Sequence, residues 1–251
     1  MPIKADGYDV LMATEMLDYI ELSDNQGIEQ ALAVFDDSTI LPTAKNALKN
    51  CVELAEQNNL FVKTQEIKLG TYIMNPEKAK VYGGYSGFGG IPDFITLNLF
   101  PNVYILTRIP ALVAHEFHHN LRFSYFKWAH GDVAVDDYLV IEVLAESFAK
   151  ELYGEKLLGP WVTSMDQDDL DYSIEVIGEA LGVKGFAEVA SFMFGNEISR
   201  AQGYQPVGLS FCAGYAVGYE VVQSFLKNSG KTIYEATLLG SEKIIRGSGV
   251  F

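Results

Sequence analysis

Three of the four histidines of this chain fall within five consecutive residues, His115-Glu116-Phe117-His118-His119. His115 and His119 are four residues apart, so a helix would place both imidazoles on one face. Two histidines in this arrangement can bind one zinc ion. Glu116 lies between them and can act as the general base on a zinc-activated water. The pattern therefore predicts a zinc hydrolase that hydrolyses its substrate with Glu116 as catalytic base.

A catalytic zinc usually has three protein ligands and one open position, so a third ligand must come from elsewhere. His118 is expected to point aside, and His130 lies in a predicted loop, where it is a minor candidate. The better candidate is Glu142, which shares an otherwise mostly apolar segment with Glu146. The two glutamates are four residues apart, so Glu142 can bind zinc while Glu146 accepts a hydrogen bond from His115. The alternative is that both glutamates face solvent on an amphipathic helix.

The composition narrows the class of protein. The chain has 251 residues, of which 49% are hydrophobic and 20% charged, as in ordinary globular proteins. The formal net charge of −15 repels phosphate groups, which argues against nucleic acid or an anionic membrane as a partner. Cys51 and Cys212 are isolated and form neither a disulfide framework nor a metal-binding pair.

Neither a targeting segment nor a membrane span is predicted. The first 20 residues mix acidic and apolar side chains, which is unlike a secretory signal. No run of about 18 apolar residues occurs along the chain. We therefore expect a soluble, cytoplasmic protein.

The predicted elements place the histidine motif near the middle of the chain. Pro110 lies where the first turn of a helix would begin, and the absence of Gly and Pro from 111 to about 123 lets one helix hold the whole motif. A second helix over 133–153 carries both glutamates. Upstream we expect a helix at 39–57, a strand at 61–72 and a turn at Asn75-Pro76. A glycine-rich loop or hairpin at 82–92 and a strand at 94–100 follow. Pro42 would have to lie in the first turn of its helix. Downstream, an acidic run at 166–171 is a linker or a helix start. Helical segments follow near 172–181, 185–194, 210–227 and 232–239.

Three blocks of this sequence resemble the YjaZ-like family of predicted bacterial zinc-dependent proteases. The blocks are Val113-Ala114-His115-Glu116-Phe117-His118-His119, Glu142-Val143-Leu144-Ala145-Glu146 and Gly214-Tyr215-Ala216-Val217-Gly218-Tyr219, in the order of the family. The first two together are also similar to the gluzincin arrangement of thermolysin-like and aminopeptidase-like metallopeptidases. Family members often have Gly directly after the ligand glutamate, where this chain has Val143. A branched side chain there could shift the packing of its helix.

The resemblance implies an α+β, zincin-like fold. Residues 1–125 would form a mixed α/β part with the zinc-binding helix, and 126–251 a mostly helical part that supplies the third ligand. We expect these parts to form one compact catalytic unit with a cleft between them. One Zn²⁺ per chain would be held by His115, His119 and Glu142.

The resemblance also assigns further roles. Tyr215, in a Tyr-x-x-Gly pattern, would stabilise the oxyanion of the reaction, with Tyr219 as the alternative. Small residues at 213, 214, 216 and 218 would let the helix of Tyr215 approach its neighbours closely. The glycine-rich segment at 82–91 or the strand at 94–100 would line the substrate cleft.

The implied activity is that of a gluzincin-type zinc metallopeptidase acting on a peptide or protein. The alternatives are a zinc-binding regulatory protein without proteolytic turnover, and a helical interaction module in which the motif is a coincidence. The sequence predicts neither the cleavage specificity nor the oligomeric state.

Overall fold

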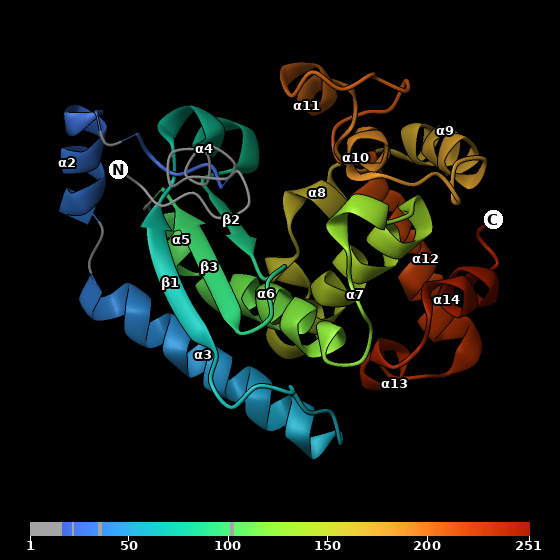
Figure 1. Cartoon of the computed structure of the whole chain (residues 1–251), viewed down its shortest axis with the longest axis horizontal. Helices are drawn as coiled ribbons and strands as arrows, with labels where there is room; N and C mark the ends of the chain where they lie inside the picture. The colour runs from blue at the N-terminus through green and yellow to red at the C-terminus, as the bar shows by residue number, and fades with distance from the viewer. Residues whose placement is uncertain (1–16, 22, 35–36, 101–102) are drawn as a thin grey trace. The chain divides into compact units, whose positions relative to one another are not determined.

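The computed structural model describes residues 17–21, 23–34, 37–100 and 103–251, and its fold is mixed α/β (Figure 1). The chain divides into two compact units. Unit 1 comprises residues 1–57 and 61–120, and unit 2 comprises 58–60 and 121–251. Most of the segment tested above for a secretory signal lies outside the described residues. Within the described part of the chain, no helix combines the length and apolarity that a bilayer crossing requires.

Unit 1 contains a three-stranded sheet of order β1-β3-β2, formed by β1 (Lys68–Ile73), β2 (Tyr85–Phe88) and β3 (Phe94–Leu99). The central strand β3 pairs in parallel with β1 and antiparallel with β2. Alternate residues of β3 are fully buried, namely Ile95, Leu97 and Leu99. The predicted strand at 94–100 is therefore confirmed. Of the loop or hairpin expected at 82–92, the structure shows one strand, β2, which forms a hairpin with β3. The strand predicted over 61–72 was too long, because β1 begins only at Lys68, where it can pair with β3.

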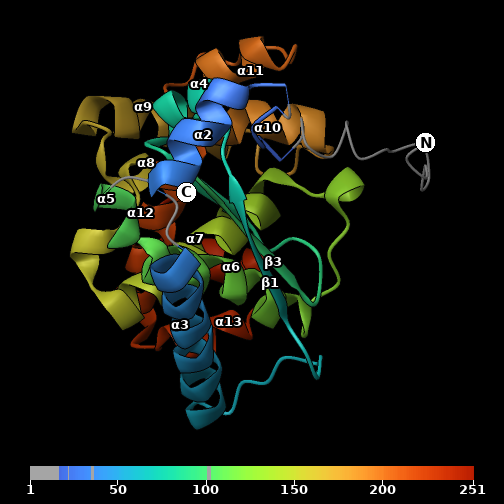
Figure 2. The ribbon, with the colours of Figure 1, turned by 90° about the vertical axis from the view of Figure 1, so that its left-hand side faces the viewer.

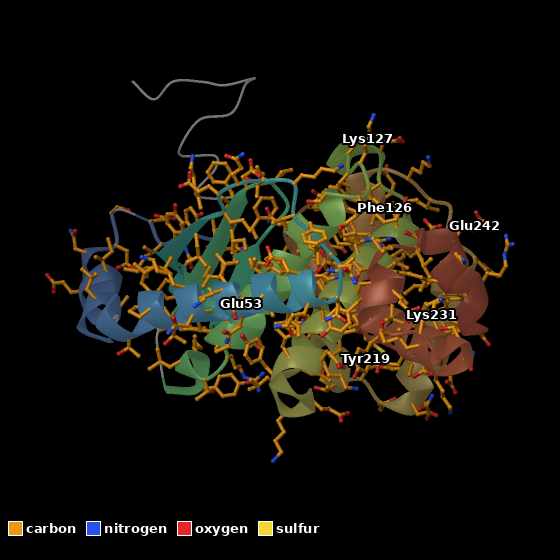
Figure 3. The ribbon with its side chains drawn as sticks, turned by 90° about the horizontal axis from the view of Figure 1, so that it is seen from below. Glu53, Phe126, Lys127, Tyr219, Lys231 and Glu242 are labelled. Atoms are coloured by element: carbon orange, nitrogen blue, oxygen red, sulfur yellow. The ribbon has the colours of Figure 1, made fainter. Side chains whose placement is uncertain are left out.

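Among the described residues, three helices precede or interrupt the sheet: α2 (Asn25–Val34), α3 (Asp37–Gln57) and α4 (Pro76–Tyr82). The view in Figure 2 turns α2 and α3 toward the reader. Helix α3 is amphipathic. One stripe of it is buried, comprising Ile40, Ala44, Ala47, Cys51 and Ala55. Its outer side carries an exposed ion pair between Lys49 and Glu53, the latter labelled in Figure 3.

Two predictions for this region were wrong. Pro42 lies inside α3 rather than in its first turn, because the helix already begins by Asp37. The exposed side of a helix tolerates such a proline better, since water can bond the carbonyl that loses its partner. Asn75-Pro76 is not a plain turn but the start of α4. The Asn75 side chain accepts hydrogen bonds from the backbone N–H groups of Glu77 and Lys78, and Pro76 lies at the helix start.

The predicted motif helix is confirmed as α6 (Ile109–Phe123), which follows the short α5 (Val103–Leu106). Every residue from 111 to 120 is buried. A helix buried on all sides can carry polar side chains only where each has a specific partner. Each polar side chain between His115 and Asn120 therefore needs a specific partner within the protein.

Unit 2 is built of helices in the part of the chain that the structure describes. They are η1 (His130–Asp132), α7 (Val135–Tyr153), η2 (Glu155–Leu157), α8 (Pro160–Thr163), α9 (Gln167–Gly178), α10 (Phe186–Phe194), α11 (Asn196–Ala201), α12 (Ala213–Ser229), α13 (Ile233–Thr237) and α14 (Ser241–Ser248). Helix α12 packs against α7, α8, α9, α10 and α14, so it forms the centre of this unit. The acidic run is a helix start, since the Asp166 carboxylate caps α9.

The close approach predicted for α12 is confirmed at two of its glycines. A Cβ on Gly218 would lie 2.6 Å from Val143 and 3.1 Å from the carbonyl oxygen of Leu139. A Cβ on Gly214 would lie 2.7 Å from the Cα of Met193. The branched Val143, which departs from the family pattern, thus fits against α12 because position 218 has no side chain.

Candidate metal centre and catalytic site

His115 and His119 lie on the same face of α6, as their spacing predicts. Both are buried, with 8% and 6% of their surfaces exposed. Their ring centroids are 4.9 Å apart and the ring planes stand at 77° to each other. Two imidazoles in this arrangement can each turn one ring nitrogen toward a common point. The geometry is therefore compatible with a shared metal ion.

Glu142 completes a set of three possible metal ligands. It is half-buried on α7, and one carboxylate oxygen, together with one ring nitrogen from His115 and one from His119, forms a group whose atoms all lie within 4.8 Å of one another. Two imidazoles and one carboxylate are a known donor set for catalytic zinc. His118 is fully buried but is not a member of this group. His130, the alternative third ligand, begins η1.

Glu116 lies on the side of α6 that faces the edge strand β2. It is 4% exposed. A Cβ on Gly87 would come within 2.4 Å of a Glu116 carboxylate oxygen, and one on Gly89 within 2.2 Å of the Glu116 backbone oxygen. Gly87 therefore leaves the room in which this carboxylate is held, and Gly89 lets the backbone of α6 approach closely at Glu116. The sequence indicated close backbone approaches in this segment, but not that the partner would be Glu116.

We expect Gly89→Ala to destabilise the protein, because the added methyl group would meet a backbone atom of α6 that cannot turn away. Overpacking of this kind costs about 1–3 kcal/mol of unfolding free energy. Urea denaturation followed by circular dichroism measures this loss. Gly182→Ala is the matched control, since a Cβ there has no atom within 4 Å. Equal stabilities of the two variants would contradict the packing described here.

Glu146 lies one helical turn after Glu142 and is only 3% exposed. Its carboxylate accepts hydrogen bonds from the backbone N–H of Gly159, at 2.6 Å, and from the indole Nε1 of Trp161, at 3.3 Å. The alternative in which both glutamates face solvent is thus wrong for Glu146. Its predicted hydrogen bond with His115 stays a prediction.

Trp161 connects Glu146 with the tyrosine predicted to act in catalysis. The rings of Trp161 and Tyr215 meet edge to face with centroids 6.5 Å apart, and Tyr215 also contacts Phe194. Tyr215 is half-buried in the first turn of α12. Sequence reasoning missed Trp161, and neither its spacing nor its surroundings in the sequence could have revealed this link.

The hydroxyl of Tyr219 accepts a hydrogen bond from a lysine. The Lys150 ammonium donates a hydrogen bond to the Tyr219 hydroxyl at 2.7 Å and another to Gln223 Oε1 at 3.2 Å. Burial raises the pKa of Tyr219, while the hydrogen bond and charge of Lys150 oppose that rise. Figure 3 labels this tyrosine among the side chains of unit 2. Tyr215 and Tyr219 are therefore in different surroundings although they are one turn apart.

Cys212 directly precedes α12 and has a left-handed conformation, with φ of 56°. Burial raises the pKa of its thiol to about 12. We expect Cys212 in the native protein to resist thiol reagents at pH 8, since the thiolate is the reactive form. Labelling with a disulfide reagent, with and without urea, measures this protection. The Cys212 thiol ionises at a lower pH in the unfolded chain than in the folded protein. The free energy of unfolding should therefore fall as the pH rises from about 9 to about 12.

Cys51 is also a buried cysteine, so labelling of the wild type would report on two thiols. Cys51→Ala leaves Cys212 as the single thiol, so the measured rate belongs to it alone. Rapid labelling of this variant at pH 8 in its folded state would contradict the buried, protonated thiol.

Comparison with known proteins identifies a family whose model covers the three blocks of sequence described above. Residues 42–246 match the family described as "Predicted Zn-dependent protease (DUF2268)". The chain is 52% identical to "Uncharacterized protein YjfC" of Bacillus subtilis (strain 168), an alignment that covers 100% of this chain and 85% of that protein. It is 27% identical to "Uncharacterized protein YjaZ" of the same organism over 55% of this chain and 49% of that protein. No solved structure matches significantly. The family model covers most of the chain, including all three blocks, so this protein belongs to the YjaZ-like family of predicted zinc-dependent proteases.

Proposed function

We propose that this protein is a zinc-dependent metallopeptidase of the gluzincin type, with one zinc ion held by His115, His119 and Glu142. The observation that carries the proposal is the grouping of these three side chains beside the buried carboxylate of Glu116. The residues suit zinc chemically, because imidazole and carboxylate are both ligands of catalytic zinc sites. A zincin-like fold is part of the same proposal.

Zinc bound in such a site lowers the pKa of a water molecule from 15.7 to about 7 and polarises a carbonyl group. Glu116 would accept the proton of the attacking water and deliver it to the leaving amine. Gly87 supports this role, because it leaves space for the carboxylate without a competing side chain. The buried position of Glu116 strengthens its interactions, since little water screens them.

Tyr215 would donate a hydrogen bond to the oxyanion that forms on the substrate carbonyl. Its ring is held by Trp161 and Phe194, so its position is fixed before the substrate binds. Tyr219 is the weaker candidate, because its hydroxyl already binds Lys150. Glu146 would hold this region in place through Trp161, in addition to orienting His115.

The substrate would bind in an extended form along β2. Among the described strands, β2 is at the edge of the three-stranded sheet, whereas β3 is central and has partners on both sides. Of the two segments that the sequence offered for this role, the structure therefore favours the one that contains β2. Exposed edges of sheets bind extended peptides through backbone hydrogen bonds.

The direct test is turnover of a quenched fluorescent peptide library by the purified protein. We expect cleavage that is lost on chelation and restored by added zinc, with one zinc per chain by elemental analysis. Zinc at that stoichiometry without any turnover would instead favour a zinc-binding regulatory protein. A preparation that neither contains nor takes up zinc would overturn the proposal altogether.

A further inference from the structure

Asn120 follows His119 on α6 and lies four residues after Glu116, so Glu116 and Asn120 share one side of the helix. Asn120 is only 4% exposed. Its Oδ1 accepts a hydrogen bond from the backbone N–H of Asp93 at 2.8 Å. Its Nδ2 donates to the backbone oxygens of Gly89, at 3.0 Å, and Phe94, at 3.1 Å. One amide thus holds both ends of the segment that joins β2 to β3.

The segment held by Asn120 has a conformation that requires support. Asp93 adopts a φ of 74°, in the left-handed region that residues other than glycine rarely occupy. Such a residue persists where its surroundings fix it. The hydrogen bond to Asn120 is one such constraint, and the bond from Lys68 N–H to the Asp93 oxygen is another. The turn is therefore fixed from α6 on one side and from β1 on the other.

The hydrogen bonding of β2 shows which of its peptide groups face the outer edge of the sheet. Phe100 N–H donates to the Gly84 oxygen at 2.8 Å, so residues 84, 86 and 88 exchange hydrogen bonds with β3. By the alternation of an antiparallel pair, the peptide group of Gly87 points away from β3. Gly89 would continue this outer edge, but its oxygen is bound by Asn120.

We propose that Asn120 is a positioning residue that fixes the outer edge of β2 beside Glu116 and ends it at Gly89. The inference rests on the proposed function, because it assigns the Gly87 peptide group to the backbone of an extended peptide substrate. Recognition at this point depends on main-chain atoms, since Gly87 has no side chain. The substrate class is accordingly a peptide that is extended where it passes Glu116, with little selection of side chains by Gly87.

Asn120→Asp is the sharpest variant, because the new carboxylate has the same shape and can still accept from Asp93 N–H. It has no donor for the oxygens of Gly89 and Phe94, so the two hydrogen bonds that hold the end of β2 are lost. Thr237→Val is the control. It removes a fully buried hydroxyl that donates to the Ile233 oxygen at 2.8 Å, far along the chain from β2.

Two measurements on the full-length, zinc-loaded protein test the proposal. Hydrogen exchange by mass spectrometry should show roughly 10- to 100-fold faster exchange over residues 85–94 in Asn120→Asp, since a buried acceptor loses its donor. Steady-state kinetics on a peptide that the wild type cleaves should show KM raised about tenfold or more, with kcat changed less. Thr237→Val should leave both quantities near the wild-type values.

Each outcome decides the matter. Unchanged exchange over 85–94 in Asn120→Asp would overturn the positioning role. Faster exchange with an unchanged KM would show that the hydrogen bonds of Asn120 hold the end of β2 but that this edge does not bind substrate. That result also overturns the proposal. If the wild type cleaves no peptide, the proposed function fails first. The exchange experiment and the binding of an uncleaved peptide, compared between wild type and Asn120→Asp, then decide the role of Asn120 separately.

Discussion

Glu116→Gln is expected to retain zinc and to lose hydrolysis. The amide has nearly the shape of the carboxylate and fits the same space beside Gly87. It cannot accept a proton, so the contribution of general base catalysis disappears. That contribution is worth about 10²- to 10⁴-fold in rate, and we expect kcat to fall by at least this factor. Peptide turnover and zinc content, measured on the same preparation, check both halves of the prediction.

The control for this variant is Glu53→Gln, which changes an exposed carboxylate on α3 by the same single atom. It should turn over peptide like the wild type. Glu116→Gln with full activity would remove Glu116 from the mechanism, whatever the metal content. Loss of both zinc and activity would show that Glu116 helps to hold the metal centre rather than acting only on water.

The sequence was sufficient for the parts of the site that depend on local spacing. His115 and His119 share a face because they are four residues apart on α6, and the absence of Gly and Pro from 111 to 123 predicted that helix correctly. Glu142 was singled out as a candidate because a carboxylate on a mostly apolar helix needs a partner. The grouping with the two histidines is what the structure adds to that argument.

Other parts could not be predicted from the sequence because they arise where segments distant in the chain meet. Gly89 and Asn120 are 31 residues apart and come together only when β2 packs on α6. The spacing of Asn120 from Glu116 was visible, but the backbone groups that it binds were not. The start of α4 was missed for a different reason. Asn75-Pro76 is equally typical of a turn and of a helix start, and only the bonds to Glu77 and Lys78 decide between them.

Glu142→Ala should sharply weaken zinc binding, because it removes one of three protein ligands. The metal affinity should fall by more than the roughly 10- to 100-fold that loss of a supporting partner costs. Glu146→Gln provides that comparison on the same helix, since Glu146 is one turn away and accepts from Gly159 and Trp161. Competition with a chromophoric chelator gives the zinc affinity of each variant without reference to activity.

The order of the zinc affinities of the three proteins tests whether Glu142 binds the metal. We expect the wild type to bind zinc most tightly, Glu146→Gln less tightly and Glu142→Ala least tightly. A Glu142→Ala variant that keeps one zinc per chain at wild-type affinity would place the third ligand elsewhere, with His130 the next residue to change. Equal losses in the two variants would mean that α7 holds the metal through its packing rather than through one carboxylate. Only the predicted order requires that Glu142 itself binds the zinc ion.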